Sequence, residues 1–114
     1  MFGDKRRSIR FKTFLNTEIK PKKISLEYLP GIVRNFSYDG LNFISEDFNP
    51  EPKETLELII KHPVKDTNIY AVGEIVWNKQ VNTRCYVGLK IKDMDEKLRV
   101  ELLEYAFDKS EEGS

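Results

Sequence analysis

Residues 31–44 read Gly-Ile-Val-Arg-Asn-Phe-Ser-Tyr-Asp-Gly-Leu-Asn-Phe-Ile. Two short apolar-rich runs, 31–37 and 41–44, flank the dipeptide Asp39-Gly40. Asp and Gly tolerate the positive φ angles that tight turns require, so this dipeptide is a strong hairpin signal. We therefore predict two antiparallel strands joined by a tight turn at these residues.

Similar alternation of apolar and polar residues recurs along most of the chain and indicates further strands. The last segment differs, because Leu98, Leu102 and Tyr105 recur at helical spacing. Six or so strands followed by one helix, without β-α-β alternation, predict a mainly β fold: a small antiparallel barrel or a curled sheet, capped by the helix. The other expected elements are strands at 12–20, 24–28, 55–61, 69–77 and 85–91, a turn or bulge at 29–31, a turn at 78–83 and a helix at about 95–108.

The composition describes one soluble, rather polar globular domain. A chain of 114 residues has room for one modest core, and 39% of its residues are hydrophobic while 33% are charged. No run approaches the roughly 20 apolar residues that span a bilayer, and no apolar segment follows the basic N-terminus as in a secretory signal. Cys85 is the single cysteine. We therefore expect no internal disulfide, no membrane insertion and a reducing, cytoplasmic setting.

Charge is balanced in total but unevenly distributed. The formal net charge is zero, yet residues 1–25 hold eight Lys/Arg against two Asp/Glu, and residues 93–114 hold three against eight. Non-specific nucleic-acid binding depends on a large positive surface, so this balance argues against a general nucleic-acid coat. A local basic segment suits a small anionic ligand. Alternatively, it pairs with the acidic C-terminal segment.

A candidate ligand-binding arm occupies residues 1–11. Arg6 and Arg10 share a face in a helical turn and also in an extended strand, where they lie roughly 13 Å apart. Guanidinium groups bind phosphate bidentately and donate to the O6 and N7 acceptors of guanine. Lys5 and Arg7 are further candidates in the same arm. The alternative interpretation is a solvated basic tail.

A second candidate group follows in the hairpin. If Asn35 and Ser37 both lie in a strand, they stand about 7 Å apart on one face. Their side chains both donate and accept hydrogen bonds, so together they suit the polar edge of a base. Gly40 allows a sharp turn and leaves room for a ligand to approach. These residue types also occur in turns for purely local reasons.

In this order, the two groups resemble the motifs of the PilZ domain family. Arg6-x-x-x-Arg10 resembles the first motif, and Asn35-x-Ser37-x-x-Gly40 resembles the second, Asp/Asn-x-Ser-x-x-Gly. The segment Gly73-Glu-Ile-Val-Trp77 is similar to the family's Gly-x-Val-x-Trp strand. The segment 86–91, Tyr-Val-Gly-Leu-Lys-Ile, is similar to its Gly-Leu-x-Phe strand, with isoleucine in place of the common phenylalanine. The resemblance covers about residues 5–107.

This resemblance implies a six-stranded antiparallel β-barrel with a C-terminal α-helix. Residues 1–11 would form the ligand-binding arm, 12–108 the barrel and helix, and 109–114 a disordered tail. It also implies a bacterial second-messenger receptor for cyclic di-GMP that is not an enzyme and needs no cofactor or metal.

The resemblance also implies residue roles. The arginines of the first motif, here Arg6 and Arg10, clamp phosphates and guanine, with Arg7 as a helper. Asn35 and Ser37 contact guanine, and Gly40 shapes the turn. An Asp can accept from both N1–H and the exocyclic amine of guanine, whereas Asn35 offers one acceptor oxygen. We therefore expect weaker binding than in a version with Asp.

A ligand-driven switch is a further expectation. Chain termini are poorly ordered unless something ties them down. Cyclic di-GMP would draw the arm onto the barrel and so present a surface to an unidentified effector protein. We expect a monomer or weak dimer that does not bind nucleic acid.

Two alternative functions remain at this stage. One is a single-stranded nucleic-acid-binding barrel, in which the three arm arginines contact phosphates and Phe36, Tyr38 or Phe43 stack on bases. The other is a PilZ-like adaptor that binds only protein.

The remaining candidate residues give little indication of a metal-binding or catalytic role. Trp77 either stacks on a guanine or packs at the barrel rim. His62 has no second His or Cys at ligand spacing, so no metal site is expected. Cys85 is typical of core packing, and Ser37 has no neighbouring His, so no catalytic residue is expected.

Overall fold

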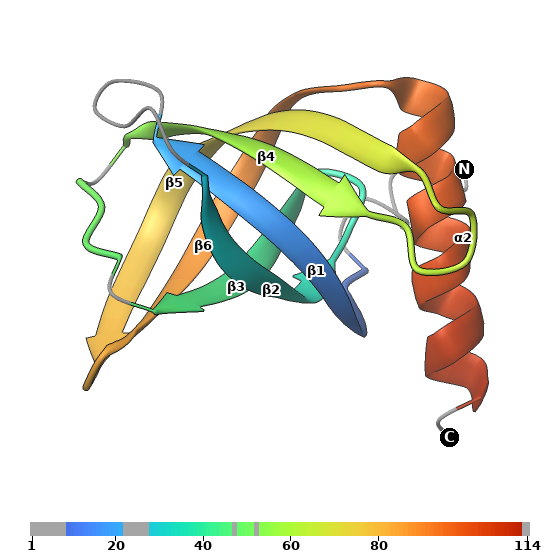
Figure 1. Ribbon diagram of the computed structural model, residues 1–114. Coiled ribbons are helices and arrows are strands. Elements are labelled where there is room, and N and C mark those ends of the chain that lie inside the picture. The colour runs from blue at the N-terminus through green and yellow to red at the C-terminus, as the bar shows by residue number, and fades with distance from the viewer. Residues whose placement is uncertain (1–8, 22–27, 47, 52, 113–114) are drawn as a thin grey trace.

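The computed structural model describes residues 9–21, 28–46, 48–51 and 53–112. Within these residues six antiparallel strands close into a barrel in the order β1-β2-β3-β6-β5-β4, and one helix follows (Figure 1). The predicted barrel and C-terminal helix are thereby confirmed. The elements are β1 (Phe11–Pro21), β2 (Leu29–Phe36), β3 (Gly40–Glu46), β4 (Thr55–Lys61), β5 (Asn68–Val81), β6 (Arg84–Met94) and α2 (Glu96–Glu112).

The period-2 pattern of the sequence sets which side chains fill the barrel. In β1 every second side chain, from Thr13 to Ile19, is buried, and the residues between them are exposed or half-buried. Thr17 satisfies its buried hydroxyl by donating to the carbonyl of Ile59, 2.9 Å away on β4. All six strands contribute apolar side chains to one core, including Leu15, Val33, Phe43, Leu58, Ile75 and Val87.

Helix α2 lies across one end of the barrel, as Figure 1 shows. The buried residues Leu102, Leu103 and Ala106 form the face that closes this end. Asp95 caps the helix, because its carboxylate accepts a hydrogen bond from the amide of Leu98 at 3.0 Å. The cap fixes where the helix starts, immediately after β6.

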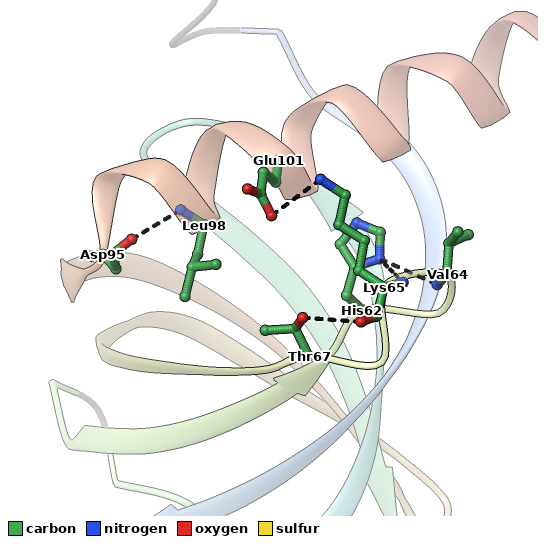
Figure 2. A network of polar contacts seen from close by, with 7 residues as sticks. All are labelled: His62, Val64, Lys65, Thr67, Asp95, Leu98 and Glu101. Atoms are coloured by element: carbon green, nitrogen blue, oxygen red, sulfur yellow. Dashed lines mark hydrogen bonds and ion pairs between the residues drawn. The ribbon is translucent and has the colours of Figure 1, made fainter.

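The loop between β4 and β5 is attached to α2 through His62 and Lys65 (Figure 2). The buried His62 accepts hydrogen bonds at Nδ1 from the backbone amides of Val64 and Lys65, both at 3.2 Å. Its ring packs edge-on to Tyr105 of α2, with centroids 5.3 Å apart. Lys65 also forms an ion pair with Glu101 at 3.4 Å. His62 is therefore a structural residue that shapes this loop.

Replacing His62 with alanine should lower the free energy of unfolding by about 2 kcal/mol, because two loop amides lose their acceptor and a buried ring is removed. Lys65→Ala is the matched control in the same loop. It breaks a partly exposed ion pair that contributes about 1 kcal/mol or less. Urea unfolding followed by circular dichroism measures both changes, and equal losses in the two variants would contradict this role for His62.

The start of β2 differs from the sequence-based expectation. Leu29-Pro30-Gly31 was expected as a turn or bulge but lies within β2, paired with Ile19, Glu18 and Thr17 of β1. Pairing with β1 thus overrides the local signal of the Pro-Gly dipeptide. Of the strand expected at 24–28, Tyr28 precedes β2 and the other residues lie outside the described part.

Several element ends also differ. β1 starts at Phe11, one residue before the expected boundary of the barrel. The turn expected at 78–83 shrinks to Asn82-Thr83, because β5 continues to Val81, and Asn82 adopts a φ of 58°. Helix α2 continues to Glu112, so residues 109–112 are helical where a disordered tail was expected. Residues 113–114 lie outside the described part.

Candidate functional site

One row of paired residues crosses five strands on the outer surface of the barrel. The strand registers place Lys12 of β1 beside Asn35 of β2, Asn35 beside Asn42 of β3, Asn42 beside Gly88 of β6, and Gly88 beside Trp77 of β5. Neighbouring strands lie about 5 Å apart, so this row presents polar groups and one large ring on a continuous surface. We call these five residues the outer row.

Arg10 reaches the middle of the outer row. Its side chain is exposed, and Nη1 donates a hydrogen bond to Oδ1 of Asn42 at 2.9 Å. The residue immediately precedes β1, yet its guanidinium lies over β3. A residue of the predicted arm is therefore held against the barrel next to Asn35.

The turn from Ser37 to Gly40 is closed by hydrogen bonds of its own. The Ser37 amide donates to the Gly40 carbonyl at 2.8 Å, and the Ser37 hydroxyl donates to the same carbonyl at 3.0 Å. The Gly40 amide in turn donates to Ser37 Oγ at 3.2 Å. A serine hydroxyl has one donor and two acceptor lone pairs, so this buried hydroxyl keeps only one acceptor position for a ligand.

Gly40 is required for a reason other than the one expected. Neither Asp39 nor Gly40 has a positive φ angle, so the turn does not use left-handed backbone there. Instead, a Cβ on Gly40 would lie 2.4 Å from the carbonyl oxygen of Leu89 on β6. Close contact between the backbones of β3 and β6 explains the glycine.

Two surface hollows lie on this part of the barrel, one lined by Arg10 and the other by its hydrogen-bond partner Asn42. The first, which we call the turn hollow, has a volume of about 510 Å³. The second, the strand hollow, has a volume of about 190 Å³. The turn hollow is lined by residues that include Arg10, Ser37, Asp39, Gly40, Val76 and Lys90. The strand hollow is lined by residues that include Arg34, Asn35, Asn42, Ile44, Trp77 and Tyr86.

The charges around the hollows favour an anion. Arg10 and Lys90 line the turn hollow with Asp39 as the acidic residue, and Arg34 lines the strand hollow. The Arg34 guanidinium also lies over the ring of Phe14, 4.7 Å from its centroid, which holds it on the outer surface. Arg10 therefore links the two hollows, since it lines the turn hollow and donates a hydrogen bond to Asn42 of the strand hollow.

Trp77 lies flat over Gly88. A Cβ on Gly88 would be 2.1 Å from the indole Nε1, so the indole ring occupies space that any side chain at position 88 would fill. The β5–β6 register shifts between Ile75 and Trp77, and both Val76 and Trp77 point outward, with Trp77 44% exposed. The indole therefore presents an open face at the end of the outer row.

The structure brings only part of the predicted site together. Asn35 and Trp77 line the strand hollow, and Arg10 is hydrogen-bonded to Asn42 of the same hollow. Ser37 lies after the end of β2 and lines the turn hollow, so it does not share a strand face with Asn35 as expected. Lys5, Arg6 and Arg7 lie outside the described residues.

Asn42, Lys12 and Lys90 also lie on this surface but were not predicted from the sequence. Lys12 lies two residues after Arg10, and Asn42 lies two residues after Gly40. Residues two apart in a strand point to the same face, so this spacing is the signal that could have identified them. Lys90 gives no such signal, because it faces Gly40 only through the register of β3 with β6.

Other kinds of chemistry find little support. Burial raises the pKa of the Cys85 thiol, which makes it a poor nucleophile. Among the described residues, no group of three His, Cys, Asp or Glu side chains is placed to hold a metal ion. No helix in the described part is long and apolar enough to cross a membrane. Phe36 and Phe43, two of the rings considered for base stacking, are buried in the core.

Comparison with known proteins identifies a family and related folds. The family model described as PilZ domain matches residues 4–108. The Bacillus subtilis inhibitor of motility, MotI/DgrA, superposes with a TM-score of 0.73 at 18% identity, over 89% of this chain and 49% of that protein. This chain therefore spans about half the length of the Bacillus protein. The PilZ domain of CeSA from a cellulose-synthesizing bacterium gives a TM-score of 0.62 at 12% identity, over 89% of this chain and 97% of that domain. No curated protein matches the sequence.

Proposed function

Because this chain belongs to the PilZ domain family, whose members are generally receptors for cyclic di-GMP, we propose that it binds cyclic di-GMP on the outer surface of its barrel. The observation that carries the proposal is the hydrogen bond from Arg10 to Asn42. This bond holds an arginine of the first motif between the two hollows. Residues of the second motif line both of them: Ser37 and Gly40 the turn hollow, and Asn35 the strand hollow.

The ligand chemistry matches what this surface offers. Cyclic di-GMP carries two phosphates and two guanines. Guanidinium groups bind phosphates bidentately and donate to guanine O6 and N7, so Arg10 and the motif arginine Arg6 suit both targets. The Asn35 amide lies half-exposed in the strand hollow and offers both a donor and an acceptor to a guanine edge. The exposed face of Trp77 is available for stacking on the base.

We assign structural roles to the two remaining residues of the second motif. Ser37 and Gly40 shape the turn, since the serine hydroxyl is engaged by the Gly40 backbone and the glycine permits contact with Leu89. Ligand binding would draw the basic arm onto this surface and present it to an effector protein. Phe36 and Phe43 are buried and cannot stack on bases, so of the three rings considered for the nucleic-acid alternative only the half-buried Tyr38 is left, which speaks against that alternative.

Calorimetric titration tests the proposal. We expect saturable binding of cyclic di-GMP and no measurable binding of cyclic di-AMP, since adenine lacks the O6 acceptor that the arginines recognise. Titration with a single-stranded oligonucleotide is the control for general phosphate binding. If only the oligonucleotide released heat on titration, the nucleic-acid-binding barrel would be favoured. If neither cyclic dinucleotide nor the oligonucleotide released heat, the protein-only adaptor would be favoured.

A further inference from the structure

The turn that lines the turn hollow is tied to the first turn of helix α2. Arg99 Nη1 donates a hydrogen bond to the carbonyl oxygen of Tyr38 at 3.0 Å. The Arg99 guanidinium also lies over the Tyr38 ring, 4.5 Å from its centroid. The Tyr38 hydroxyl in turn donates to the carboxylate of Glu96 at 2.8 Å. We call these three residues the helix clamp.

The helix clamp joins parts of the chain that are far apart in sequence, since Tyr38 and Arg99 are separated by 61 positions. The Arg99 side chain is only 13% exposed. Its Nε is buried without a hydrogen-bond partner, because the nearest Glu96 oxygen is 3.9 Å away. This nearly buried guanidinium is hydrogen-bonded to Tyr38, lies over its ring and is ion-paired with Glu96, so it is well placed to fix the conformation of the turn.

Tyr38 lies between the residues that a ligand would contact. Ser37, Asp39 and Gly40 all line the turn hollow, and they flank the carbonyl that Arg99 holds. The opposite side of the turn is fixed by β6, since the Ile91 amide donates to the Asp39 carbonyl at 2.7 Å. The turn is therefore held between β6 on one side and Arg99 on the other.

We propose that helix α2 senses occupancy of the turn hollow, with Arg99 as the residue that positions the Ser37–Gly40 turn for the ligand. The inference rests on the proposed binding of cyclic di-GMP. A ligand that binds the turn in the conformation held by Arg99 favours that conformation, and with it the docked helix. Ligand binding therefore strengthens docking of α2 on the barrel, and helix docking strengthens ligand binding by the same factor.

Hydrogen exchange of the full chain, with and without saturating cyclic di-GMP, tests this coupling. We expect the amides of α2 from Leu98 to Leu103 to exchange at least about fivefold more slowly with ligand, in the usual range of allosteric coupling. Arg99→Ala should weaken cyclic di-GMP binding by a similar factor in calorimetry and should abolish the ligand-dependent slowing. A purely structural role for Arg99 would leave that slowing in place.

Two further variants keep the test decisive if Arg99→Ala folds poorly. Tyr38→Phe removes the hydroxyl that bonds Glu96 but keeps the ring and the carbonyl that Arg99 contacts, so we expect a smaller loss of both affinity and ligand-dependent protection. Lys97→Ala, at an exposed position in the same helical turn, is the matched control and should behave as the wild type. The coupling alone would be overturned if the wild type bound cyclic di-GMP while hydrogen exchange of α2 stayed unchanged. It would also be overturned if Arg99→Ala and Tyr38→Phe both bound with full affinity. No binding by the wild type would overturn the proposed function and the coupling with it.

Discussion

Replacing Arg10 with alanine is expected to lower the affinity for cyclic di-GMP by about 30- to 900-fold. The estimate corresponds to roughly 2–4 kcal/mol for the loss of one charged, hydrogen-bonded partner of a phosphate or guanine. Arg10 is exposed and its hydrogen bond goes to Asn42 on the barrel surface, so the core does not depend on it. Calorimetric titration should show the loss of binding, while the midpoint of urea unfolding stays unchanged.

Two companion variants sharpen this test. Arg10→Lys keeps the charge but loses the planar, forked donor set, so we expect an intermediate loss of about tenfold. Arg84→Ala removes an arginine that is also exposed but is paired with Glu46 at 3.3 Å, at the start of β6. It lies outside both hollows and should leave binding unchanged. Equal affinities of the wild type and Arg10→Ala would refute the assigned role of Arg10.

Gly40→Ala is expected to destabilise the fold by about 3 kcal/mol, at the upper end of the usual cost of overpacking. The added Cβ would lie 2.4 Å from the carbonyl oxygen of Leu89, which is backbone in the paired strand β6. Neither strand can move without disturbing the ladder between β3 and β6. Urea unfolding should show a lower midpoint with an unchanged slope.

Gly31→Ala is the contrasting variant. Its Cβ would lie 2.5 Å from Cδ1 of Ile19, the far end of a flexible side chain, and 3.2 Å from the carbonyl oxygen of Ile44. Rotation of the isoleucine relieves most of this contact, so we expect a loss of about 1 kcal/mol. If Gly40→Ala proved no more harmful than Gly31→Ala, close contact of the two strands would not be what requires Gly40.

The fold was largely predictable because each strand buries one face. Alternation along β1 and β4 marks the inward residues directly, and the 3.6-residue period marks the buried face of α2. Errors arose where partners distant in sequence decide the outcome. Leu29-Pro30-Gly31 carries a local turn signal, yet these residues pair along β1.

The candidate site was less predictable, for a related reason. The motifs pointed to Arg10, Asn35 and Gly40 but gave no register. Only the register shows that Asn42 lies between Asn35 and Gly88, and that Lys90 faces Gly40. Local spacing likewise suggested that Ser37 shares a face with Asn35, whereas the strand ends at Phe36 and the serine turns inward.

Closure of the barrel limits how an effector protein can bind. Each of the six strands has a hydrogen-bonded neighbour on both sides over part of its length, so the described barrel leaves only short stretches, such as residues 11–16 of β1 on the side of β4, to which another chain could add a β-strand. Recognition between the two proteins would then depend mainly on side chains. Point substitutions on the surface should therefore be able to separate effector recognition from folding.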